Sequence, residues 1–140
     1  MSVRPIIHGF TCGCFDSLDG KLHPGHILLL QVAANYCDVL TVAVNRDDYC
    51  RRKKGPNRPL LPLLDRMESV RLAAERLPCR VIVDELKDDN PRGLLSRIKP
   101  DVLIVGSDYR GQPLPGVLHV QRVIYVERIN GVSTTLLAGR

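Results

Sequence analysis

The sequence has few aromatic residues and no tryptophan, since Phe and Tyr together make up 4% of its 140 residues. Proteins that bind single-stranded nucleic acid stack bases on aromatic rings, so a nucleic-acid partner is not expected. Long hydrophobic runs are also missing, and none approaches the length of a membrane span. Residues 1–5 lack the apolar stretch of a secretory signal. These absences predict a protein that has neither a membrane nor a nucleic-acid partner.

The cysteines do not indicate a disulfide framework. They are five in number, which is odd, and they are unevenly spaced. Reduced thiols are typical of the cytosol, so we expect a cytoplasmic protein.

The sequence does carry an excess of positive charge. Its formal net charge of +5 favours an anionic ligand. Four basic residues are adjacent at 51–54, which suits a local grip on phosphate, although a solvated basic turn would have the same sequence. Hydrophobic residues make up 44% of the chain, enough for a single globular domain, which we expect to span 1–140.

Apolar segments alternate with segments of helical period, an order typical of a parallel α/β sheet. We expect strands at 6–12, 38–45, 79–83, 101–105 and 122–126, and helices at 24–36, 63–77, 91–98 and 134–138. The segment 51–62, rich in Pro, Gly and basic residues, is expected to be a loop. The sequence therefore predicts one Rossmann-like α/β domain, a five-stranded parallel sheet with helices on both faces.

Glycine and polar residues follow several predicted strands where each strand ends. They are Cys12-Gly13, Asn45-Arg46, Gly106-Ser107-Asp108 and the segment 130–133. Ligands of open α/β sheets bind at the carboxyl ends of the strands, near the point where the strand order reverses. We therefore expect these residues to gather at one edge of the sheet, together with His23 and His26.

The two histidines bracket a Pro-Gly pair at the start of a predicted helix. At the N-cap and in the first turn, both imidazoles can face the space before the helix, where backbone N–H groups and the helix dipole attract phosphate. Positioned donors of this kind stabilise charge on a reacting phosphate. The simpler interpretation is that His23 only caps the helix and that His26 is an ordinary surface residue.

A zinc site is a further interpretation of this segment. Cys12, Cys14, His23 and His26 supply a Cys2His2 ligand set. The Cys-x-Cys spacing is unusual for structural zinc, however, so no metal bound by the protein itself is predicted.

Several motifs carry a resemblance to a known family. They are Gly13-Cys14-Phe15-Asp16, His23-Pro24-Gly25-His26, the Lys-Gly-Pro-Asn-Arg-Pro segment at 54–59, Ser107-Asp108-Tyr109 and the segment 131–135. In this order they resemble the cytidylyltransferase-like nucleotidyltransferases, over nearly the whole chain. The 54–59 segment is most similar to the heptose-1-phosphate adenylyltransferase type, the transferase domain of ADP-heptose synthase.

The resemblance implies a reaction and its residues. ATP would donate AMP to a sugar 1-phosphate, a glycero-manno-heptose 1-phosphate, with release of pyrophosphate, and Mg²⁺ would accompany the triphosphate. The catalytic residues implied are His23, His26 and Lys54. The nucleotide-binding residues implied are Cys12, Gly13, Phe15, Gly25, Gly106, Ser133, Thr134 and Thr135. The substrate-binding residues implied are Asp16, Asn45, Arg51, Arg66 and Asp108. A homodimer and a separate sugar kinase upstream are implied as partners.

Simpler roles stay open for three of these residues. Arg66 could form a surface salt bridge, Ser133 could be an N-cap, and Asp108 could form an Asx-turn.

The chain also departs from the pattern of the family. Six residues, 17–22, separate Asp16 from His23, where the family usually has a shorter segment. Val105 stands where a Lys is frequent, and 109–133 is short. A cytidylyltransferase that acts on glycerol 3-phosphate or another alcohol phosphate therefore stays an alternative, and so does a non-catalytic nucleotide-binding module.

Overall fold

The computed structural model describes residues 4–17, 20–87, 92–106 and 120–127. Its strands are β1 (His8–Gly13), β2 (Val39–Asn45), β3 (Arg80–Leu86), β4 (Val102–Gly106) and β5 (Arg122–Val126). They form one five-stranded sheet in the order β3-β2-β1-β4-β5, and every neighbouring pair is parallel. The described helices are α1 (Pro24–Tyr36), α2 (Asp47–Lys54), α3 (Leu63–Ala74) and α4 (Arg92–Ile98).

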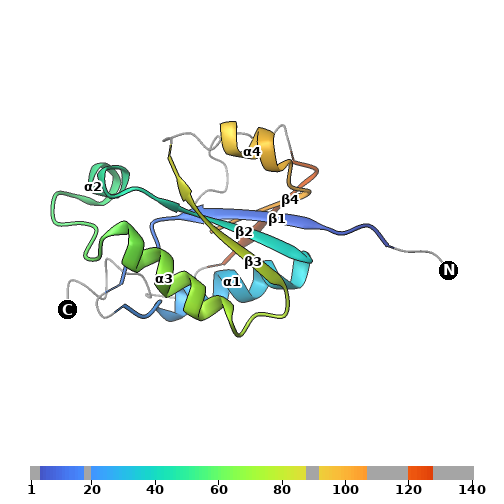
Figure 1. Cartoon of the computed structure of the whole chain (residues 1–140), viewed down its shortest axis with the longest axis horizontal. Coiled ribbons are helices and arrows are strands. Elements are labelled where there is room, and N and C mark those ends of the chain that lie inside the picture. The colour runs from blue at the N-terminus through green and yellow to red at the C-terminus, as the bar shows by residue number, and fades with distance from the viewer. Residues whose placement is uncertain (1–3, 18–19, 88–91, 107–119, 128–140) are drawn as a thin grey trace.

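Helices cover both faces of the sheet (Figure 1). On one face, Leu30 of α1 and Val70 of α3 pack against Val42 in a core built from alternate strand residues. On the other face, Leu95 of α4 packs against Phe10 of β1. The strands are almost continuously apolar because both of their sides are covered. The single α/β domain predicted from the sequence is confirmed.

The segment 51–54 differs from its prediction, because it forms the last turn of α2 and not the start of a loop. Asp47 and Asp48 occupy the first turn and the basic residues the last, an order that complements the helix dipole at both ends. Only Cys50 of this helix is buried, so its sequence carries almost no hydrophobic period to reveal it.

Other helix and strand boundaries differ from the predicted ones by a few residues. β3 was expected to end at Val83, before two acidic residues, yet it continues to Leu86 in register with β2. As an edge strand it leaves Asp84 and Glu85 half-buried, which tolerates their charge. Helix α3 ends at Ala74, and turns replace the expected helix up to 77. The helix expected at 134–138 lies outside the described residues.

Candidate active site

The carboxyl ends of the strands lie beside the N-termini of α1 and α3 and beside the whole of α2, at the left of Figure 1. The chain runs from β1 outward to β2 and β3, and then crosses back to β4 on the other side of β1. This reversal of strand order is where ligands of open α/β sheets bind. Gly13, Asn45 and Gly106 end β1, β2 and β4, as the sequence predicts.

His23 is the N-cap of α1. Its backbone is extended, and its Nδ1 accepts hydrogen bonds from the backbone N–H groups of Gly25 at 3.0 Å and His26 at 3.4 Å. A ring nitrogen that accepts from an N–H carries no proton, so the proton of neutral His23 lies on Nε2. The capping role is therefore real, and it orients the ring and its remaining N–H.

The imidazole of His26 stacks on that of His23, with centroids 3.8 Å apart and planes 25° from parallel. The centroid of the His26 ring also lies 5.2 Å from that of Phe15, in a tilted arrangement. Phe15 is buried and has a positive φ of 51°, a left-handed conformation that costs a bulky residue about 1–2 kcal/mol. A side chain at residue 13 would place its Cβ 3.3 Å from the Phe15 ring, which accounts for Gly13 at this position.

The N–H groups in the first turn of α1 are already hydrogen-bonded to His23. Those of His26 and Ile27 donate to the His23 carbonyl at 3.0 and 3.1 Å, and that of Gly25 is taken by the His23 ring. The sequence predicts that a phosphate meets these backbone donors. In this conformation the helix offers a phosphate its dipole and its two imidazoles instead.

Asp16, expected to bind substrate, is 1% exposed and holds two loops together. One carboxylate oxygen accepts from Arg58 Nε at 2.9 Å and from the Leu60 N–H at 2.7 Å, and the other from the N–H groups of Leu61 and Ser17. Burial alone would raise the pKa of Asp16, but the hydrogen bonds from Leu60, Arg58 and Leu61 outweigh it, and the pKa lies below its ordinary value.

Arg66 lies at 0% exposure in the first turns of α3, so the surface salt bridge considered above is wrong. Its Nη1 donates to the carbonyl oxygens of Cys14 and Asn45, each at 2.7 Å, and its Nε donates to the Leu61 carbonyl at 2.9 Å. Its Nη2 pairs with Asp47. One guanidinium thus joins the ends of β1 and β2 to α2 and α3. Its expected contact with substrate stays a prediction.

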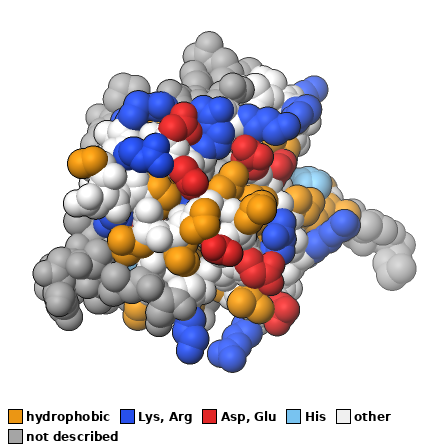
Figure 2. Space-filling view, turned by 60° about the vertical axis from the view of Figure 1, so that its left-hand side comes forward, with side chains coloured by type: hydrophobic (Ala, Val, Ile, Leu, Met, Phe, Trp, Pro, Cys, Tyr) orange, Lys and Arg blue, Asp and Glu red, His pale blue; other side chains and the backbone are white. Residues whose placement is uncertain are grey.

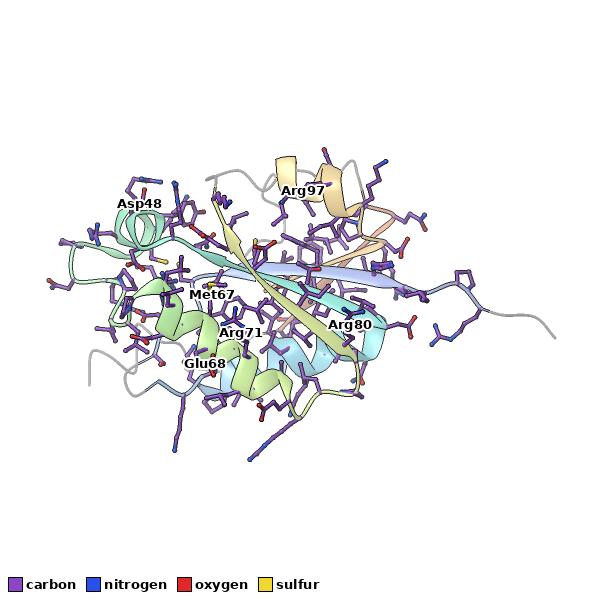
Figure 3. All side chains as sticks on the ribbon, in the orientation of Figure 1. Asp48, Met67, Glu68, Arg71, Arg80 and Arg97 are labelled. Carbon is purple, nitrogen blue, oxygen red and sulfur yellow. The ribbon has the colours of Figure 1, made fainter. Side chains whose placement is uncertain are left out.

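The two expected phosphate ligands on α2, Arg51 and Lys54, lie exposed in its last turn. The positive charge of Lys54 acts on Cys14, which places this lysine near the loop that leaves β1. Figure 2 turns this side of the molecule forward and shows basic side chains gathered over its upper part, with acidic ones between them. Asp48, labelled in Figure 3, pairs with Arg52 at 3.3 Å on the same helix.

The six-residue segment after Asp16 packs against α3. The Gly20 N–H donates to Ser17 Oγ at 3.1 Å, and Ser69 of α3 donates to the Gly20 carbonyl at 2.6 Å. Leu22 is buried in the core. The described part of this insertion is therefore anchored to the fold.

The cysteines near the site differ in their pKa. Burial and the neighbouring Cys14 raise the pKa of Cys12 to about 11. A hydrogen bond from Cys50 lowers the pKa of Cys14 to about 7, against the effect of burial and with help from Asn45, Lys54 and Arg66. In the described part of the chain no three His, Cys, Asp or Glu residues are placed to hold a metal, so the zinc ligands considered above are not brought together.

The remaining expected site residues, Asp108, Ser133, Thr134 and Thr135, lie outside the described residues. Two buried groups of this edge, Arg58 and Cys50, are not among the residues predicted from the sequence. The 54–59 motif contains Arg58, but the sequence does not show that this arginine is buried, and only a buried arginine requires a partner. No sequence signal pointed to Cys50. Among the described helices, none is long and apolar enough to cross a membrane.

Comparison with known proteins identifies the family. The cytidylyltransferase-like family matches residues 10–138. The chain is 41% identical over 136 residues to the Bifunctional protein HldE of Gluconacetobacter diazotrophicus, and 41% identical over 137 residues to that of Acidiphilium cryptum. Each comparison covers 94% of this chain, which spans 26% of the length of either relative.

A solved structure supports the same fold. The lipopolysaccharide core biosynthesis protein from Thermoplasma volcanium matches with a TM-score of 0.64 at 21% identity, over 90% of this chain and 100% of that one. With the family matched over most of its length, the chain belongs to the cytidylyltransferase-like family and is a nucleotidyltransferase.

Proposed function

We propose that the protein transfers AMP from ATP to a sugar 1-phosphate, with a glycero-manno-heptose 1-phosphate as the acceptor, and releases pyrophosphate. The observation that carries this proposal is the stacked pair His23 and His26 at the start of α1, beside the reversal of strand order. Similarity to proteins named HldE and the 54–59 motif support the adenylyl and heptose assignments.

The reaction is an in-line displacement at the α-phosphorus. An oxygen of the acceptor phosphate forms a bond to this phosphorus, the bond to the β-phosphate bridging oxygen breaks, and pyrophosphate leaves with the electron pair. Such a reaction needs positioning and charge stabilisation more than covalent catalysis. The His23 Nε2 proton is held in place by the cap at Nδ1, so it can be donated to a phosphate oxygen without reorganisation.

Cations on α2 would complete the phosphate site. Lys54 would neutralise charge on the triphosphate, with Arg51 assisting, because both end a helix that lies beside the carboxyl ends of the strands. Their exposure leaves them able to turn toward a ligand.

The hydrogen bonds of Asp16 are consistent with a metal ion that binds together with the nucleotide and is not held by this carboxylate. Asp16 already accepts hydrogen bonds at both of its oxygens from protein donors. Mg²⁺ would therefore be held by phosphate oxygens and water, a common arrangement for this ion, and would neutralise charge on the triphosphate. A homodimer, a cytoplasmic location and a sugar kinase that acts upstream complete the proposal.

Pyrophosphate release tests the proposal. The purified protein is supplied with Mg²⁺, each of ATP, CTP, GTP and UTP, and a panel of heptose 1-phosphates and glycerol 3-phosphate. Release with ATP and a heptose 1-phosphate is the expected result. Release with CTP and glycerol 3-phosphate would establish the cytidylyltransferase alternative, and calorimetric nucleotide binding without any release would establish the binding module.

Two variants of His23 separate capping from chemistry. Asn is a strong N-cap, and its Oδ1 can accept from the same backbone N–H groups, so His23→Asn should keep the stability of the protein. His23→Ala should lose about 1 kcal/mol of stability through the lost cap. Both should lose roughly 10²-fold or more in turnover, as His26→Ala should, because a preorganised donor to the reacting phosphate is gone. Full turnover in His23→Asn or His26→Ala would exclude the catalytic role of that ring.

A further inference from the structure

Two buried thiols lie at the carboxyl edge of the sheet, on two different segments. The proposed reaction gives neither thiol a chemical role. Cys14 belongs to the loop that leaves β1, and Cys50 lies in the middle of α2. Cys14 is 7% exposed and Cys50 is 0% exposed. The two thiols share Asn45 and Arg66 as neighbours, and each acts on the pKa of the other.

Shared neighbours hold the two sulfurs in place. Asn45 donates from Nδ2 to Cys14 Sγ at 3.8 Å, and its carbonyl accepts from Cys50 Sγ at 3.9 Å. Arg66 donates to Cys50 Sγ at 3.4 Å and to the Cys14 carbonyl at 2.7 Å. Both residues are themselves buried, so neither thiol can move away from the other without disturbing this set of contacts.

We propose that Cys14 and Cys50 form a peroxide-sensitive dithiol, whose closure to a disulfide ties the loop after β1 to α2 and reversibly inhibits the enzyme. The attacking and resolving sulfurs follow from charge. Thiolates react with peroxide and thiols hardly do, and Cys14 has a pKa of about 7. The hydrogen bond to Cys14 and burial raise the pKa of Cys50, which stays a thiol until Cys14 is oxidised.

The oxidation is balanced with hydrogen peroxide as the oxidant. The Cys14 thiolate attacks one peroxide oxygen, the O–O bond breaks, and hydroxide leaves, so that Cys14 becomes a sulfenic acid. The Cys50 sulfur then attacks Cys14 Sγ, the S–O bond breaks, and water leaves with the Cys50 proton. The two thiols lose two electrons in total, and the peroxide is reduced to water.

Closure changes the geometry that the proposed reaction needs. A disulfide brings the two sulfurs to about 2.05 Å from each other, so the loop and α2 are pulled together. The same loop carries Phe15 against His26, and the same helix ends at Lys54. The inhibition rests on the proposed function, whereas the formation of the disulfide does not.

A second pair of thiols provides a control within the same chain. Cys37 and Cys79, at the amino ends of β2 and β3, also act on each other's pKa. Burial and Cys79 raise the pKa of Cys37 to about 12, and burial raises the pKa of Cys79, with Asp38 adding to both effects. In both pairs each thiol acts on the pKa of the other, but the neighbouring cations Lys54 and Arg66 act only on the first pair.

The test maps disulfides in the full-length protein after limiting hydrogen peroxide at pH 7, followed by alkylation and peptide mass spectrometry. Fragmentation must separate Cys12 from Cys14, because no Lys or Arg lies between them and both fall in one tryptic peptide. The Cys14–Cys50 link is expected to exceed the Cys37–Cys79 link by roughly tenfold or more, since reaction follows thiolate content. A Cys12–Cys14 link, a dominant Cys37–Cys79 link or no link at all would overturn the proposal.

Variants assign the two roles. Cys50→Ser cannot resolve a sulfenic acid, so dimedone should label Cys14 in this variant far more than in the wild type, and Cys14→Ser should show no such label. Equal labelling of Cys50→Ser and wild type would exclude Cys50 as the resolving residue. Cys37→Ser is the matched control and should form the Cys14–Cys50 link at the wild-type rate.

Activity is measured separately. Oxidised wild type should release pyrophosphate at least roughly tenfold more slowly, and dithiothreitol should restore the rate, because the exchange of a disulfide with added thiol is reversible. Full activity of the oxidised protein would refute the inhibition. If the reduced protein is inactive with every substrate pair, the proposed function fails, and the disulfide map still decides whether the dithiol exists.

Discussion

The two edges of the sheet use charge in opposite ways. At the amino edge, Arg4 pairs with Asp38 at 2.6 Å, and the arginine side chain is 70% exposed. At the carboxyl edge, Asp16 and Arg58 pair at 2.9 Å with 1% and 7% of their side chains exposed. Both pairs join segments that lie outside the helices and strands, but water surrounds only the first.

The difference follows from what each edge must hold. At the amino edge, partly exposed carboxylates supplement backbone pairing: the Asp101 N–H donates to the His8 carbonyl at 2.7 Å, and the His8 N–H donates to the Asp101 carboxylate at 2.8 Å. At the carboxyl edge, the segments around the candidate site are irregular and their polar backbone groups are buried, so side chains must satisfy them. Asp16 serves three backbone donors and Arg66 three backbone acceptors. Buried charged side chains thus satisfy the backbone groups of the loops around the candidate site.

The largest effect should come from Arg66→Met. This variant keeps much of the buried volume but leaves the carbonyl oxygens of Cys14, Asn45 and Leu61 without their donor, so stability should fall by about 3–5 kcal/mol. Urea unfolding followed by circular dichroism measures it. Arg71→Met is the matched control on the same helix, since Arg71 pairs only loosely with Glu68 at 3.6 Å (Figure 3) and should change stability by less than about 0.5 kcal/mol.

Activity distinguishes this account of Arg66 from its expected role in substrate binding. If Arg66→Met kept full stability and lost only affinity for the acceptor, the guanidinium would belong to the substrate site and the comparison of the two edges would fail.

How much of the fold and the site can be predicted from the sequence depends on how far apart along the chain the interacting residues lie. The strands, α1 and the gathering of Gly13, Asn45 and Gly106 at one edge follow from local hydrophobic patterns and from the rules for parallel sheets. The roles of Asp16 and Arg66 do not, because their partners lie far along the chain: Asp16 meets Arg58 across 42 residues, and Arg66 meets Cys14 across 52. Contacts of this kind leave no periodic signal in the sequence.

An intermediate effect is expected from acid. The pKa of Asp16 is lowered in the folded protein, so its contribution to stability is complete above about pH 5 and is lost as the pH falls through the ordinary carboxyl range toward the folded value. Asp16→Asn should therefore cost about 3 kcal/mol at neutral pH and progressively less in acid. Unfolding free energies measured from pH 7 down to pH 3 would show the two curves converging.

The salt dependence of stability distinguishes the two edges of the sheet in the same experiment. Arg4 and the Ile7 N–H lower the pKa of Asp38 to about 2, so Asp38→Asn should also flatten the acid dependence. Because this ion pair is exposed, concentrated sodium chloride should weaken the effect of Asp38, while that of Asp16 should persist. A salt-sensitive Asp16 effect would mean that water reaches the buried pair.

The smallest effect should come from Arg4→Met at the amino edge. The Asp38 carboxylate keeps its hydrogen bond from the Ile7 N–H at 2.8 Å, and water replaces the exposed guanidinium, so unfolding by urea at neutral pH should be indistinguishable from that of the wild type. What should change is the titration of Asp38, whose pKa should rise from about 2 toward its ordinary value when its main partner is gone. Carboxyl chemical shifts followed by NMR across acidic pH measure this rise. A loss of stability as large as that of Arg66→Met would show that the amino edge also depends on its charges, and that burial is not what divides the two edges.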